Sequence, residues 1–234
     1  MYPRETIAAI ATPTGSGGIA VIRVSGDDAR QIGRAVFRGF PEDPASHRLY
    51  AGRFINADGE PIDRGLAVTM LAPRSYTGED VVELHCHGGA IVTRALLAAT
   101  LAAGARSARP GEFTLRAFLN GKLDLAQAEA VADLVDARTE GAARLADAQL
   151  GGALSRAIEV HRQKLIGVAA ALEAAIDFAD EDDVDFDAAA IAGALGGERD
   201  ELRRLAETFR AGRLLREGAR VVFAGEPNVG KSSL

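Results

Sequence analysis

Short apolar runs alternate with turn-forming segments through the first 121 residues, and this pattern predicts strands and helices in mixed order. The predicted strands are Thr6–Ala11, Ile19–Val24, Arg48–Ile55, Leu66–Leu71 and Val81–Cys86. The first two are expected to form a hairpin across TPTGSGG. The predicted helices are Asp27–Phe37, with Ser25 as its N-cap, and Ile91–Ala103. An α/β or α+β domain is therefore expected.

The pattern becomes helical after Gly121. Asp124 and Gln127 have the spacing of a capping box at a helix N-terminus. An apolar stripe from Leu150 to Ile176 predicts one long amphipathic helix, and Leu202, Leu205 and Phe209 predict another. The acidic segment 177–187 is expected to connect them as a solvated linker, although it could also attract a basic partner. The second part of the chain is therefore predicted to be all-α.

A glycine-rich motif closes the sequence. Residues 220–224 are predicted to form a strand, and Gly225–Ser232 fits G-x-x-x-x-G-K-[ST] in full. Backbone amides of such a loop surround phosphate oxygens, Lys231 is placed to reach the β- and γ-phosphates, and Ser232 to hold Mg²⁺. The motif therefore predicts the start of an α/β nucleotide-binding domain.

Composition narrows the class of protein. Hydrophobic residues make up 47% and charged residues 26%, which is typical of a globular chain. The net charge of -6 argues against a broad basic face for nucleic acid, but it does not exclude a local basic patch. The single cysteine, Cys86, is compatible with a reducing compartment. The N-terminal apolar run is too short for a membrane span, and a cytoplasmic protein without membrane attachment is expected.

The predicted strand at residues 81–86 holds candidate site residues. Glu83, His85 and His87 share one face by alternation, and Cys86 lies on the other as a small buried side chain. A His-x-His pair with a carboxylate could bind zinc, but no fourth ligand is in view, so a solvated strand acid is preferred. Arg23 could pair with Asp27 or Asp28 at a sheet edge.

Two other polar residues have simple structural interpretations. Lys122 could be a solvated turn residue. His161 lies on the apolar stripe and is interpreted as a boundary histidine with a satisfied hydrogen bond, not as a metal ligand.

Five stretches together resemble the MnmE (TrmE) family of tRNA-modification GTPases. They are ATPTGSGGIAVIRVSG, SYTGEDVVELHCHGG, ARPGEFTLRAFLNGKLDLAQAEAVADLVDA, AAIDFADED and LLREGARVVFAGEPNVGKSSL. The resemblance implies an α+β folate-binding and dimerisation domain at 1–121, an incomplete all-α helical domain at 122–217, and the start of an inserted GTPase domain at 218–234. It also implies that this chain is part of a longer protein and, by itself, does not hydrolyse GTP.

The same resemblance implies the chemistry. Such proteins modify C5 of the wobble uridine of certain tRNAs with a folate one-carbon unit, act with a flavoprotein of the GidA (MnmG) type, and form homodimers. By resemblance, Arg23, Glu83 and Lys122 would bind 5-formyltetrahydrofolate or another reduced folate. GTP would contact Asn228, Val229, Gly230, Lys231, Ser232 and Ser233, with Mg²⁺ on Ser232 and K⁺ on Asn228. Cys86 does not match the C-terminal cysteine of the family.

Two rival hypotheses remain open from sequence. The chain could be a non-catalytic folate-binding dimerisation module, or a one-carbon transferase that acts through its first domain alone. The downstream reading frame would discriminate the GTPase from the non-catalytic module, because guanine-binding and switch motifs are required for GTP hydrolysis.

Overall fold

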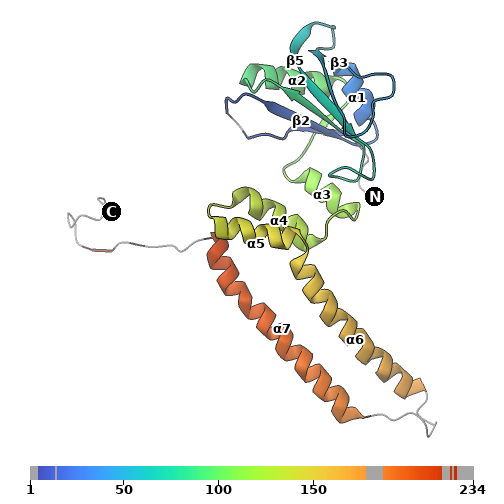
Figure 1. Cartoon of the computed structure of the whole chain (residues 1–234), viewed down its shortest axis with the longest axis vertical. Coiled ribbons are helices and arrows are strands. Elements are labelled where there is room, and N and C mark those ends of the chain that lie inside the picture. Colours follow the sequence, from blue (N-terminus) through green and yellow to red (C-terminus); the bar gives the residue numbers. More distant parts are fainter. Residues whose placement is uncertain (1–4, 14, 178–186, 218–221, 223, 226–234) are drawn as a thin grey trace. The chain divides into compact units, whose positions relative to one another are not determined.

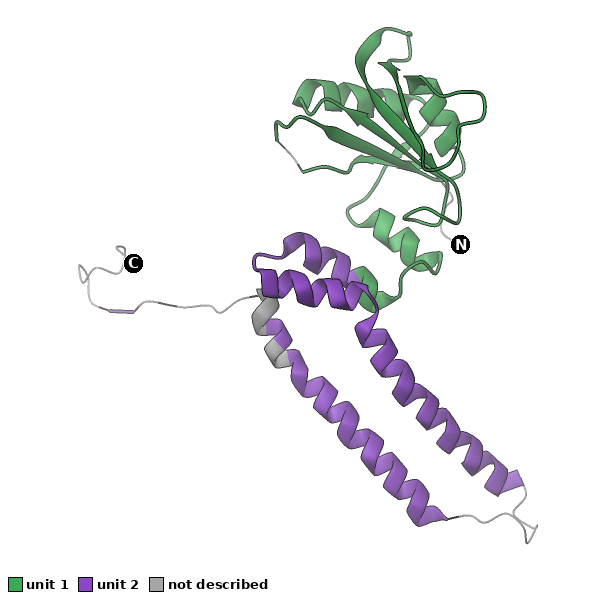
Figure 2. Cartoon of the chain, in the orientation of Figure 1, with its two compact units in different colours: residues 1–128 green, residues 129–234 purple. Residues whose placement is uncertain are grey.

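The computed structural model describes residues 5–13, 15–177, 187–217, 222, 224 and 225. It divides into two compact units, residues 1–128 and 129–234 (Figure 2). None of the helices in these described ranges is both long and apolar enough to cross a membrane.

The first unit is built on a mixed seven-stranded sheet (Figure 1). Its order is β3(Phe37–Arg38), β4(Leu49–Ile55), β5(Pro61–Met70), β6(Val81–Cys86), β2(Ala20–Ser25), β1(Ile7–Ile10) and β7(Arg106–Ser107). Every pair is antiparallel except β1 with β7. The expected β1–β2 hairpin is present, and the predicted strand at Leu66 starts earlier, at Pro61.

Two helices cover one face of this sheet. They are α1(Ala29–Val36) and α2(Ala90–Ala102), which contact each other as well as the strands. Ile22, Val82 and Leu84 are buried beneath them. The alternate residues of the same strands, such as Arg23 and Glu83, therefore lie on the opposite face, which these two helices do not cover. We call this side the open face.

The predicted role of Ser25 as a helix cap is wrong. Ser25 is the last residue of β2 and is fully buried, and its hydroxyl bonds to Thr77 Oγ1 and Glu79 Oε2, each at 2.7 Å. Gly26 follows with φ of 134°, so the chain turns before the helix begins. Asp28 occupies the N-cap position instead, and no side chain caps this helix.

Helix α3(Glu112–Leu119) was not predicted, and α4(Leu125–Asp136) follows it. The predicted capping box starts α4: the Asp124 amide donates to Gln127 Oε1 at 2.9 Å, and the Gln127 amide donates to Asp124 Oδ1 at 2.8 Å. These reciprocal bonds satisfy amides that have no partner within the helix.

The second unit contains part of α4 and three further helices: α5(Glu140–Leu150), α6(Ala153–Asp177) and α7(Ala188–Glu217). The long helix predicted over Leu150–Ile176 is present as α6, but it starts at Ala153, because Gly152 has φ of 80° and separates it from α5, which ends at Leu150. Helices α6 and α7 run antiparallel, and α6 has no buried residue (Figure 1). Between residues 220 and 224, where a strand was predicted, Val222 and Ala224 are in no strand, and the others lie outside the described residues.

Candidate functional site

An ion pair lies at the centre of the open face. Arg23 on β2 and Glu83 on β6 are directly opposite in register, and Arg23 Nε and Nη2 lie 2.9 and 2.8 Å from Glu83 Oε1. Their side chains are only 26% and 17% exposed. The strand partner of Arg23 is therefore Glu83 and not Asp27 or Asp28. Cross-strand register, which the linear sequence does not display, decides this pairing.

The second carboxylate oxygen of Glu83 remains available. It accepts no hydrogen bond from the described residues, and His85 Nε2 lies 3.4 Å from it. That nitrogen is enclosed and is also without a hydrogen bond within the described part of the chain. An enclosed polar atom that lacks a partner is uncommon in a folded protein. Glu83 Oε2 therefore offers a hydrogen-bond acceptor to a ligand.

Two aromatic rings border the guanidinium group of Arg23. The ring centroids of Tyr76 and Phe113 lie 5.1 and 5.6 Å from Arg23 Cζ, within the range of cation–π contact. The Tyr76 hydroxyl also bonds to Thr114 Oγ1 at 2.8 Å. Flat apolar surfaces beside a charged pair suit a planar ligand that also carries polar edges. Sequence reasoning did not select either aromatic residue, although both lie in the family-like stretches.

Lys122 contacts the loop that carries Tyr76. Its Nζ donates to the Pro73 carbonyl at 3.1 Å, while the Asn120 side chain donates to the Thr77 carbonyl at 2.8 Å. The structure thus brings Arg23 and Glu83 together directly, and it connects Lys122 to them only through this loop. This loop therefore contacts Lys122 through Pro73 and Arg23 through Tyr76, and Glu83 contacts Arg23.

A buried charge network holds α3 beside the site. Glu112 is 2% exposed, and its Oε1 lies 2.7 Å from Arg106 Nη2 and 3.3 Å from Arg116 Nη2. Arg116 also contacts Glu79 at 3.0 Å. Hydrogen bonds from Arg106, above all, lower the pKa of Glu112 to about 2, despite the opposing effect of burial. The network fixes α3, and therefore Phe113, against the sheet.

The structure does not support a zinc site at Glu83, His85 and His87. The His87 ring bonds instead to Asp63, with Nδ1 2.8 Å from Oδ1. Within the described ranges, these three residues do not bring their ligand atoms together. Cys86 is buried on the opposite face as expected, and this burial raises the pKa of its thiol.

His161 has the satisfied hydrogen bond that was expected. Its Nδ1 lies 2.7 Å from Glu198 Oε2, and Glu201 is nearby at 3.8 Å. These three residues could hold a metal ion by geometry, but Lys164 Nζ already contacts both carboxylates, at 2.6 and 3.4 Å. We interpret the group as a helix–helix ion-pair cluster.

The predicted nucleotide-binding residues lie outside the described residues. These are Asn228, Val229, Gly230, Lys231, Ser232 and Ser233.

Two known families match consecutive parts of the chain. The family described as "GTP-binding protein TrmE N-terminus" matches residues 6–122, and "MnmE helical domain" matches residues 125–228. The chain belongs to the MnmE family of tRNA modification GTPases. The resemblance inferred from sequence motifs is thereby confirmed, as is the order of an N-terminal mixed-sheet domain followed by a helical domain.

Individual MnmE proteins are similar along the whole chain. The "tRNA modification GTPase MnmE" of Geobacter sulfurreducens is 51% identical over 243 residues, which cover 100% of this chain and 52% of the relative. The protein of the same name from Protochlamydia amoebophila is 45% identical over 240 residues, covering 100% of this chain and 51% of the relative. The protein of the same name from Symbiobacterium thermophilum is 51% identical over 241 residues, which cover 98% of this chain and 51% of the relative. The chain thus spans about half the length of the curated relatives it matches.

Proposed function

We propose that this chain is the folate-binding and helical portion of a GTPase that modifies C5 of the wobble uridine in tRNA. In this proposal a reduced folate, such as 5-formyltetrahydrofolate, supplies a one-carbon unit, and a flavoprotein of the GidA (MnmG) type completes the reaction. The protein is a cytoplasmic homodimer. GTP binds the motif at 225–232, with Mg²⁺ on Ser232 and K⁺ on Asn228.

The proposed folate binding rests on the Arg23–Glu83 pair, in which Glu83 Oε2 is available to a ligand. A pterin ring presents adjacent N–H donors, and a carboxylate can accept two of them in parallel. Arg23 occupies Glu83 Oε1, and Oε2 can accept one of these donors, while Tyr76 and Phe113 border the guanidinium group at the same place. The residues present therefore suit a flat ring with a polar edge.

Arg23 and Lys122 have different roles in this proposal. Arg23 orients the Glu83 carboxylate from the neighbouring strand. Lys122 holds the loop of Tyr76 through the Pro73 carbonyl, and it can exchange this contact for a carboxylate of the folate tail. Loss of Glu83 should therefore weaken binding more than loss of Lys122, because an exposed ion pair contributes only about 0–1 kcal/mol.

The test of folate binding is calorimetric titration of the 234-residue chain with 5-formyltetrahydrofolate. Glu83→Gln should weaken binding at least tenfold, because the amide keeps the size of the side chain but replaces one acceptor by a donor. Asp43→Asn, at an exposed carboxylate of the same unit, is the matched control and should bind normally. Unchanged affinity of the Glu83→Gln variant for 5-formyltetrahydrofolate would contradict the proposal that Glu83 binds the pterin ring.

The test of the cellular function uses the complete protein. Cells that lack the gene should lose the C5-modified wobble nucleoside, measured by mass spectrometry of digested tRNA. The unaltered gene should restore it, and the Glu83→Gln form should not. Unchanged nucleosides in the deletion strain would contradict the proposed reaction whatever the folate result.

A further inference from the structure

Three arginines lie side by side at one end of the sheet. Arg38 of β3 is opposite Arg53 of β4, and Arg53 is opposite Arg64 of β5. All three side chains are exposed. Neighbouring strands are about 4.8 Å apart, so the register places three positive side chains in one row across the strands. We call these residues the arginine row.

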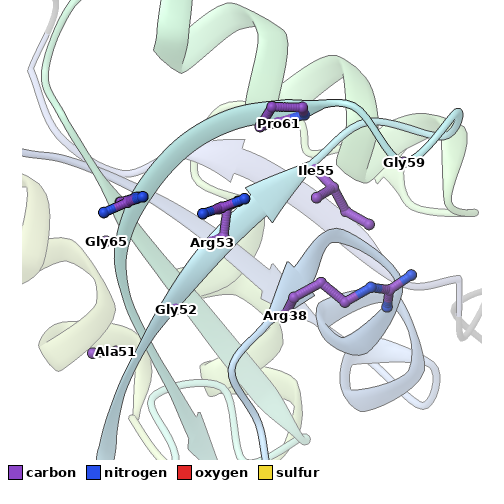
Figure 3. Close-up of a pocket in the computed structure, with 9 residues that line it drawn as sticks. Arg38, Ala51, Gly52, Arg53, Ile55, Gly59, Pro61 and Gly65 are labelled. Atoms are coloured by element: carbon purple, nitrogen blue, oxygen red, sulfur yellow. The ribbon is translucent and has the colours of Figure 1, made fainter.

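The row lines an open hollow of about 790 Å³. Its other lining residues are small or apolar: Ala51, Gly52, Ile55, Gly59, Pro61 and Gly65. Figure 3 shows Arg38 and Arg53 extending from neighbouring strands, with Ile55 and Pro61 beside them. None of the lining residues is acidic.

The positive charge of the row is not neutralised within the described part of the chain. None of the three guanidinium groups forms an ion pair there, and the one hydrogen bond involves Arg38, which donates to the Arg34 carbonyl at 3.1 Å. Like charges directly opposite on neighbouring strands destabilise a sheet. The three neighbouring arginines therefore destabilise the folded sheet unless an anion binds them, although the chain as a whole has a net charge of -6.

Two glycines shape the backbone under the row. A Cβ on Gly65 would collide with the His85 carbonyl and lie 2.8 Å from the Phe54 ring, and a Cβ on Gly52 would lie 2.5 Å from Phe37. These positions face the packed side of the sheet, so the strands can bend closely over the aromatic residues. The arginines lie on the other side of these strands and line the open hollow.

We propose that the arginine row binds consecutive phosphates of an RNA backbone, and that this RNA is the transfer RNA on which the protein acts. The identity of the RNA rests on the proposed function. Guanidinium groups form paired, charge-assisted hydrogen bonds with phosphate oxygens, and backbone contacts of this type position RNA without reading its sequence. The row and the Arg23–Glu83 pair are parts of one sheet, so a bound RNA would be held on the unit that carries the proposed folate site.

The experiment measures binding of a fluorescently labelled tRNA transcript to the 234-residue chain by anisotropy over a series of salt concentrations. The test variant is Arg53→Gln with Arg64→Gln. The matched control is Arg203→Gln with Arg204→Gln, which removes the same charge from exposed positions of α7. Circular dichroism and thermal melting of each variant establish that it is folded. The test variant should melt no lower than the unaltered chain, because it relieves repulsion between the arginines.

Salt dependence gives the expected size of the effect. Each phosphate contact contributes about 0.7–0.9 to the slope of log affinity against log salt concentration. Loss of two contacts should lower the slope by about 1.4–1.8, which corresponds to an affinity loss on the order of 20-fold at 150 mM salt relative to 1 M. The control variant should keep both the slope and the affinity.

Each other outcome would overturn the arginine row as an RNA site. The tRNA affinity could fall equally in the test and control variants, or it could stay unchanged in the test variant. The unaltered chain could also fail to bind tRNA. Finally, poly-glutamate could compete as strongly as tRNA, which would indicate a carboxylate ligand. The proposed function is judged separately by the nucleoside analysis, since a tRNA that binds elsewhere would still be modified.

Discussion

Glu112 should be among the residues on which the stability of the first unit depends most. Its carboxylate is buried and accepts from Arg106, from Arg116 and, at 2.7 Å, from the Arg109 amide. Replacement by Gln keeps the volume but removes the charge that both guanidinium groups require. We therefore expect Glu112→Gln to lower the free energy of unfolding of this unit markedly at neutral pH.

The lowered pKa of Glu112 gives the size of the expected loss in unfolding free energy. This pKa falls from an ordinary 4.5 to about 2 in the folded protein. At about 1.4 kcal/mol per pKa unit, the depression corresponds to about 3 kcal/mol of stability at pH 7. Because the folded pKa is the lower one, this contribution is complete above pH 4.5 and is lost as the pH falls toward 2. At pH 3 about 2 kcal/mol of it should be gone.

Tyrosine fluorescence during urea unfolding measures this unit alone. The chain has no tryptophan, and its three tyrosines, Tyr2, Tyr50 and Tyr76, all lie in the first unit. The difference in unfolding free energy between the unaltered chain and Glu112→Gln should be about 3 kcal/mol at pH 7 and about 1 kcal/mol at pH 3. The exposed Asp43→Asn should change it by less than about 1 kcal/mol. A difference for Glu112→Gln that is independent of pH would refute the reasoning.

Three further changes test the packing, a helix cap and the helical cluster. Gly65→Ala should lower the free energy of unfolding by about 1–3 kcal/mol in the same assay, because its Cβ meets backbone, whereas Gly18→Ala has open space and should be nearly neutral. Thr139→Ala removes the side-chain bond to the Ala142 amide and should cost about 1 kcal/mol, measured by hydrogen exchange in α5. Lys164→Gln should raise the lowered pKa of Glu198 toward its usual range in a carboxyl NMR titration, since Lys164 is the main cause of the shift; no change would place that cause elsewhere.

Local chemistry in the sequence determined much of this structure. Alternation in residues 81–86 was enough to place Glu83 and His85 on one face and Cys86 on the other, because successive strand residues point to opposite sides. The capping box at Asp124 and Gln127 was also predictable, since its two hydrogen bonds join residues three positions apart. Long motifs with this order and spacing were likewise sufficient to identify the family.

Tertiary structure decided the features that depend on contacts distant in sequence. Ser25 resembles a helix cap locally, but its partners Thr77 and Glu79 lie more than fifty residues away and hold it in the core. The pairing of Arg23 with Glu83 and the row formed by Arg38, Arg53 and Arg64 both arise from strand register. Register is determined by which faces of the strands become buried together, and this is a property of the assembled sheet and not of any one strand.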